Sequence, residues 1–150
     1  MNIVEQIDQD LKTAMLAGDK TLTTTLRGLK SVVLYAEVAA GKRDSGLENA
    51  EVIELLAKEA KKRQESADLY KQGGNTEKYE AELQEKQIIE KYLPAQLSDE
   101  ELTDLVDKAV QETGAQGPQA MGQVIGKVKQ LSKGQADGGR IAALVKARLN

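Results

Sequence analysis

The chain reads Glu90-Lys91-Tyr92-Leu93-Pro94-Ala95-Gln96-Leu97-Ser98-Asp99-Glu100-Glu101-Leu102 near its middle, and this stretch decides the fold. Proline disfavours helical geometry in the residue before it, so Pro94 predicts the end of a helix. Ser98 and Glu101 have the spacing of a capping box, in which each side chain satisfies a free backbone donor of the other residue. We therefore expect one helical domain over residues 1–93 and a second over residues 94–150.

Before this stretch, apolar residues recur at steps of three and four, which is the pattern of amphipathic helices. Glycine and polar segments divide the pattern, and they predict four helices, over about residues 2–17, 19–41, 47–73 and 76–93. Successive helices joined by short loops pack antiparallel, so residues 1–93 are expected to form an antiparallel helical bundle.

After this stretch, three shorter helices are predicted. The first begins at the Ser98 capping box and ends at Gly114, which suits a left-handed C-terminal cap. Pro118 is expected to open the second, and Asp137 to cap the third. No strand pattern appears, so the fold class is all-α, with a small three-helix domain at residues 94–150.

The composition excludes most catalytic chemistry. The 150 residues contain no Cys and no His, so there is no thiolate nucleophile, no imidazole base and no soft-ligand metal site. The acidic residues between Glu77 and Glu90 are spread around a helix with lysines among them, which does not predict a carboxylate pair in a pocket. We expect no catalytic residue, no metal and no cofactor.

The chain also lacks membrane signals. Its longest apolar run, Val32 to Ala36, is far too short to span a bilayer, and Glu5 interrupts the N-terminal region before a secretory apolar segment develops. The absence of Cys suits a reducing compartment. We therefore expect a soluble, cytoplasmic protein without a membrane partner.

Charge is unevenly distributed within the C-terminal domain. From Ser98 to Glu112 there are six acidic residues and one lysine, whereas from Thr113 to Asn150 there are six basic residues and one aspartate. Positive charge concentrated on two helices attracts phosphate backbones, although the net charge of the chain is −3. The alternative is that the acidic helix pairs with the basic ones. The candidate RNA-binding residues are Lys127, Lys129, Lys133, Arg140 and Lys146, while Arg148 projects toward the apolar side.

Two further patterns predict packing. Gly122 and Gly126 lie on one helical stripe with Lys129 and Lys133; they either admit a ligand backbone or, as we expect, pack against a neighbouring helix. In residues 47–73, Glu54 and Lys58 have the spacing of an exposed ion pair. Glu59 and Arg63 project into the apolar stripe, and they are expected to pair with each other between helices.

Three stretches of the sequence form a set that occurs in a fixed order. The first is Thr25-Leu26-Arg27-Gly28-Leu29, and the second is the stretch quoted at the outset. The third is Met121-Gly122-Gln123-Val124-Ile125, followed by the turn Lys133-Gly134-Gln135-Ala136-Asp137-Gly138 and by Leu144-Val145-Lys146. Together they resemble the YqeY family of small bacterial proteins. The motif residues with the most specific match are Tyr92, Leu93, Pro94, Gly122, Gly134, Ala136, Asp137 and Gly138. Gln135 departs from the family pattern, which more often has Lys or Arg there.

The C-terminal part of this family is similar to the tail of GatB, the B subunit of the glutamine-dependent aspartyl/glutamyl-tRNA amidotransferase. The resemblance implies an N-terminal helical bundle, a small C-terminal three-helix domain and a role in recognising tRNA. In GatB-type subunits the chemistry belongs to a cradle domain that this chain lacks. The resemblance thus implies binding, although a family label would be carbon-nitrogen ligase with glutamine as amido-N-donor.

Three functions follow as hypotheses. The first is a non-catalytic tRNA- or RNA-binding accessory protein, for which no DNA partner is expected. The second is an adaptor that docks on an acidic protein, for example in translation or tRNA modification. The third is glutamine-dependent ligase activity of the isolated chain.

Overall fold

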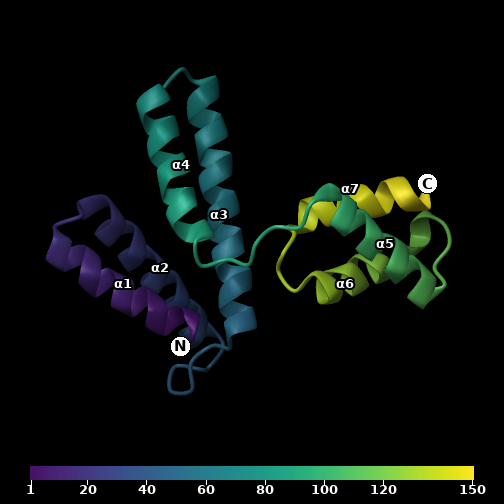
Figure 1. Ribbon diagram of the computed structural model, residues 1–150, viewed down its shortest axis with the longest axis horizontal. Helices are drawn as coiled ribbons and strands as arrows, with labels where there is room; N and C mark the ends of the chain where they lie inside the picture. The colour runs from purple at the N-terminus through teal and green to yellow at the C-terminus, as the bar shows by residue number, and fades with distance from the viewer. The chain divides into compact units, whose positions relative to one another are not determined.

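The computed structural model describes residues 1–150 and is all-helical, as predicted. It contains seven α-helices, one short 3-10 turn and no strand. The chain forms two compact units, Met1–Leu93 and Pro94–Asn150, which are described separately below (Figure 1). No helix is both long enough and apolar enough to cross a membrane.

The N-terminal unit consists of two helical hairpins, one built from α1 (Ile3–Ala17) and α2 (Lys20–Ala39), the other from α3 (Asn49–Gln72) and α4 (Thr76–Glu90). Local capping fixes where the first hairpin begins and turns. Asn2 and Glu5 form a capping box at the start of α1. Gly18 adopts a left-handed conformation (φ 70°) that an L side chain rarely takes, and Asp19 then caps α2.

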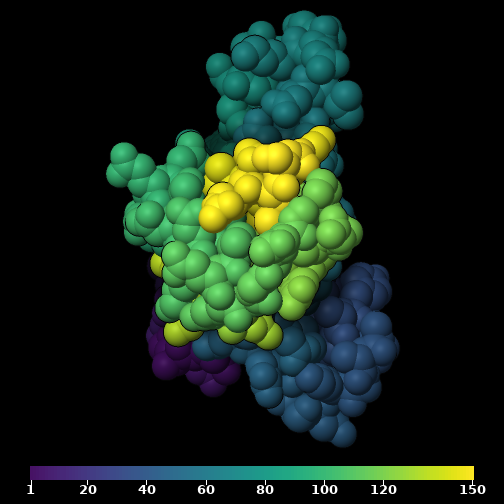
Figure 2. All heavy atoms as spheres, turned by 90° about the vertical axis from the view of Figure 1, so that its right-hand side faces the viewer, coloured from purple at the N-terminus to yellow at the C-terminus, as the bar shows by residue number.

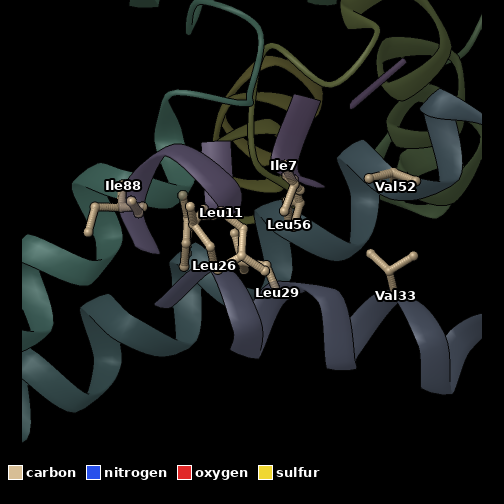
Figure 3. Packing of buried hydrophobic residues seen from close by; sticks show 11 residues of the cluster. Ile7, Leu11, Leu26, Leu29, Val33, Val52, Leu56 and Ile88 are labelled. Carbon is tan, nitrogen blue, oxygen red and sulfur yellow. The ribbon is translucent and has the colours of Figure 1, made fainter. Parts of the chain in front are cut away.

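One apolar core joins the helices of this unit. Its members include Ile7, Leu11, Leu26, Leu29, Val33, Val52, Leu56 and Ile88 (Figure 3). Leu26, Val52 and Leu56 are fully buried, so the inner faces of α2 and α3 meet without solvent between them. The core is aliphatic because the chain has no Phe or Trp.

Beyond this core, polar contacts help to hold α3 against α4. Arg63 Nη1 lies 3.2 Å from Glu82 Oε2 and 3.4 Å from Glu85 Oε2, both on α4. Glu59 instead lies 3.3 Å from Lys62. The expectation that Glu59 and Arg63 pair with each other is therefore wrong: Arg63 points across the hairpin, where α4 offers two carboxylates.

The C-terminal unit contains α5 (Asp99–Thr113), α6 (Met121–Ser132) and α7 (Gly138–Leu149) around a second apolar core. The predicted capping box is confirmed: Ser98 Oγ accepts from the Glu101 N–H at 3.1 Å, and Glu101 Oε1 accepts from the Ser98 N–H at 3.2 Å. Gly114 has the predicted left-handed conformation. Pro118 begins a 3-10 turn through Ala120, and α6 itself starts later than predicted, at Met121.

Candidate nucleic-acid interface

The cations of the C-terminal unit divide into those that pair with an acid of α5 and those that have no ion pair. Lys127 Nζ lies 3.2 Å from Glu112 Oε2, and Arg148 Nε lies 2.9 Å from Asp107 Oδ1. Both acids belong to α5. The acidic helix therefore does pair with part of the basic segment, and it neutralises the cations that point toward it.

Arg140 also points toward α5, but it makes more than an ion pair. Its Nη2 donates to Asp99 Oδ1 at 2.8 Å and to the backbone carbonyl of Leu97 at 2.9 Å. The N–H of Leu97 donates to the carbonyl of Gln135 at 2.7 Å. Both backbone groups of Leu97 are thus tied to residues 135–140, so the side chain of Arg140 holds the entry segment of the unit in place.

The motif turn between α6 and α7 supplies the geometry for this tie. Lys133 (φ 49°) and Gly134 (φ 82°) are both left-handed and reverse the chain after α6. Asp137 then accepts hydrogen bonds from the N–H groups of Gly139 (2.7 Å) and Arg140 (3.1 Å), and so caps α7 as predicted. Ala136 packs against the apolar core. The turn therefore has a structural role.

Three lysines of this segment have no ion pair: Lys129, Lys133 and Lys146, all exposed. The Cε of Lys129 lies 3.6 Å from the position that a Cβ would take at Gly138, which places this side chain over the start of α7. Lys133 lies just past the end of α6, in the turn that leads to α7. We call these three residues the lysine face.

Helical geometry turns Lys129 on α6 and Lys146 on α7 away from the sides of these helices that face α5. On α7, Arg140 and Arg148 are eight residues apart and share the side facing α5, whereas Lys146 is rotated well away from both. On α6, Lys127 faces α5 and Lys129 reaches α7. Figure 2 shows the surface of this unit, with α7 in yellow against the green of the two earlier helices.

The glycine stripe beside the lysines is open. At Gly122 and at Gly126, an added Cβ would meet no atom within 4 Å. The expectation that these glycines pack against a neighbouring helix is therefore wrong within this chain, because α6 contacts α5 and α7 through its other sides. The stripe leaves two positions of α6 without side chains on the side that carries Lys129.

The motif residues Tyr92, Leu93 and Pro94 lie at the boundary between the units. Tyr92 and Leu93 pack against the N-terminal core, and Pro94 begins the second unit. The Tyr92 hydroxyl donates to Asp10 Oδ2 at 2.5 Å, which ties the end of the bundle to α1. Partial burial raises the pKa of Tyr92 above its usual value, and the hydrogen bond and charge of Asp10 raise it further.

Replacing Tyr92 with phenylalanine is expected to lower the free energy of unfolding of the N-terminal unit by about 1 to 2 kcal/mol at neutral pH, since a hydrogen bond to a carboxylate is lost. Because the folded state raises the pKa of Tyr92, its contribution is complete below pH about 10 and is lost as the pH rises above that value. Urea unfolding of both proteins at neutral and alkaline pH measures this. An equal decline in stability at high pH in both would contradict the assignment.

No group of three or more acidic side chains is placed to hold a metal ion. The other perturbed pair, Lys42 and Glu51, is joined by a hydrogen bond of 2.6 Å, which raises the pKa of Lys42 and lowers that of Glu51. Both side chains are partly exposed, at 40% and 37%, and their contact joins the loop after α2 to α3.

Comparison with known proteins agrees with the motifs. The chain matches the family model YqeY, described as "Yqey-like protein", over residues 4–149. It is also 34% identical over 89 residues to "Altered inheritance of mitochondria protein 41, mitochondrial" from Eremothecium gossypii, an alignment that covers 59% of this chain and 48% of that protein. The chain thus spans about half the length of this relative. Since the family model covers nearly every residue, the chain belongs to the Yqey-like protein family.

Proposed function

We propose that this protein is a non-catalytic RNA-binding accessory protein, with tRNA as the first ligand to test, and that the lysine face is its contact surface. The observation that supports this most is the sorting of charge in the C-terminal unit. The cations that point toward α5 are paired with its acids, whereas Lys129, Lys133 and Lys146 remain exposed without a partner.

The chemistry of this surface suits phosphate groups. Between Thr113 and Asn150 the only acidic residue is Asp137, and its carboxylate is occupied by two N–H groups of α7. Gly122 and Gly126 present no side chains beside the lysines, so a nucleic-acid backbone can approach α6 closely. The resemblance to the GatB tail adds support for tRNA. In this proposal Lys127 and Arg140 position the helices, and the three lysines contact phosphates.

The double change Lys129→Glu/Lys133→Glu is expected to weaken tRNA binding at least tenfold at low salt, because two phosphate contacts become repulsive. Fluorescence anisotropy with a bulk tRNA pool, with duplex DNA as competitor, measures this. In the neutral variant Lys129→Ala/Lys133→Ala, log K should depend less steeply on log salt. The magnitude of the slope should decrease by about 0.7 to 0.9 per lysine.

A matched control has the same change of charge in the N-terminal unit. Lys12→Glu/Lys61→Glu replaces two exposed lysines that have no ion pair. It is expected to leave tRNA binding within about twofold at about 0.15 M salt, where charges further apart than about 8 Å are largely screened. If both double variants lose binding equally, only net charge matters, and the lysine face is not the contact surface. If the unmodified protein binds no tRNA at low salt, the adaptor hypothesis replaces this one.

Two finer points belong to the same proposal. We place the protein in the cytoplasm, since its folding needs no disulfide, and cell fractionation tests this; the name of the relative assigns that protein to mitochondria. The proposal includes no ligase activity. Amidation by the purified chain with glutamine as donor would contradict the non-catalytic part.

A further inference from the structure

A second surface, in the other unit and independent of the proposed RNA binding, carries an unpartnered apolar patch. Leu34, Tyr35 and Val38 lie on the outer side of α2, and they are 40%, 76% and 61% exposed. The opposite side of α2, with Leu26, Leu29 and Val33, is buried in the core. We call these three exposed residues the α2 patch.

The patch borders a groove between α1 and α2. The groove has a volume of about 370 Å³. Its lining is apolar at Val4, Ile7, Val33 and Leu34, and it is polar or charged at Asp8, Lys30, Ser31, Glu37 and Arg43. Leu34 belongs to both features, so the patch continues into the apolar part of the groove. An exposed apolar strip beside a groove is the geometry by which proteins receive the apolar side of an amphipathic helix.

The charges around this surface specify the partner further. The charged side chains of α2 are Lys20, Arg27, Lys30 and Glu37. Glu37 is the only acid, and its side chain is 11% exposed and lies 3.5 Å from Arg43. Lys30 is paired with Asp8 of α1 at 2.6 Å, so Lys20 and Arg27 are the cations of α2 that have no acidic partner, although residues 1–93 contain 17 acidic and 14 basic side chains.

We infer that the α2 patch and its groove bind an amphipathic helix of a partner protein whose apolar stripe is flanked by acidic residues. Its apolar side chains fill the groove, and its carboxylates face Arg27 and Lys20. A second copy of this chain packed α2 against α2 would bring these same cations together, so charge disfavours that occupant. A nucleic acid would find one aromatic ring here, Tyr35, beside aliphatic groups that do not stack with bases.

The test uses the full chain and a fluorescent synthetic helix of about 18 residues, long enough to be helical in water. One probe has leucines along one side and glutamates beside them, and the other has lysines in place of the glutamates. The glutamate probe is expected to bind at least tenfold more tightly than the lysine probe in fluorescence anisotropy. The variant Val38→Glu should lose at least tenfold of that affinity, because it adds a like charge and removes apolar contact.

Two further variants sharpen the test. Leu69→Glu makes a similar change at an α3 residue that is 68% exposed, and it should bind the glutamate probe as the unmodified protein does. Arg27→Glu should reduce the preference for the glutamate probe. Since all these positions are exposed, circular dichroism melting should be unchanged, which separates loss of binding from loss of fold.

Several results would overturn the inference. Equal binding of the two probes would remove the charge argument, and unchanged binding in Val38→Glu would remove the patch. Sedimentation analysis that finds a dimer dissolved by Val38→Glu would assign the surface to a second copy. Cosedimentation with phosphatidylglycerol vesicles that is lost in Val38→Glu, without binding of either probe, would assign it to lipid.

Discussion

Replacing Leu56 with alanine is expected to lower the free energy of unfolding of residues 1–93 by about 2 to 5 kcal/mol, while residues 94–150 unfold as before. Leu56 is fully buried in the N-terminal core, and truncation of such a residue loses both apolar transfer energy and packing. None of its core neighbours belongs to the C-terminal unit, whose apolar cluster is separate. The two transitions should therefore respond independently.

The tyrosines provide a selective measurement. All four of them, Tyr35, Tyr70, Tyr79 and Tyr92, lie in residues 1–93. Tyrosine fluorescence in urea thus reports on the N-terminal unit, whereas circular dichroism reports on helices of both units. Leu56→Ala should shift the fluorescence transition to lower urea and leave part of the helical signal at its original midpoint.

Leu102→Ala is the matched control, since Leu102 is equally buried in the other core. It should shift only a component of the circular dichroism curve and leave the fluorescence transition in place. The tyrosine fluorescence transition could instead shift as much in Leu102→Ala as in Leu56→Ala. The chain would then unfold as one cooperative unit, and residues 1–93 and 94–150 would not be independent in stability.

The second large effect is expected from Arg140→Met, which should destabilise the C-terminal unit by about 1.5 to 3 kcal/mol. Methionine keeps most of the aliphatic packing of Arg140 but cannot donate to Leu97 or Asp99, and it leaves the Leu97 carbonyl without its partner. Urea unfolding followed by circular dichroism measures the change. Because the unit has 57 residues, a loss of this size is a substantial part of its stability.

Arg148→Met separates this role from that of a surface ion pair. Arg148 contacts only Asp107, and both side chains are close to half exposed, so its replacement should cost less than about 1 kcal/mol. If the two variants lower the free energy of unfolding equally, the hydrogen bond from Arg140 to the Leu97 carbonyl adds no stability beyond that of a surface ion pair. At temperatures where Arg140→Met remains folded, its tRNA binding should match the unmodified protein if Arg140 positions the helices without contacting RNA.

The sequence predicted best those features that depend on neighbours along the chain. The Ser98–Glu101 capping box, the left-handed Gly114 and the Asp137 cap are all set within a few residues, and the structure has each of them. The capping box at Asn2 and Glu5 was missed, although its spacing is visible in the sequence. A rule that considers Asn with Ser at such positions would have found it.

The features that were not predicted depend on residues far apart in the chain. Arg63 has three acids within reach in principle, and only the packing of α3 against α4 selects Glu82 and Glu85 over Glu59. The charge totals of the C-terminal segment could not say which cations α5 neutralises, because that depends on the rotation of α6 and α7. The open side of Gly122 and Gly126 follows from the same rotation.

Lys133 has a further consequence. It is the single non-glycine residue with a positive φ, whereas the other left-handed positions, among them Gly18, Gly114 and Gly134, are glycines. A lysine in this conformation costs about 1 kcal/mol relative to an unstrained residue. The strain therefore lies at the turn that carries one of the three lysines of the proposed contact surface, so stability is lost at the same place where that proposal needs an ammonium group.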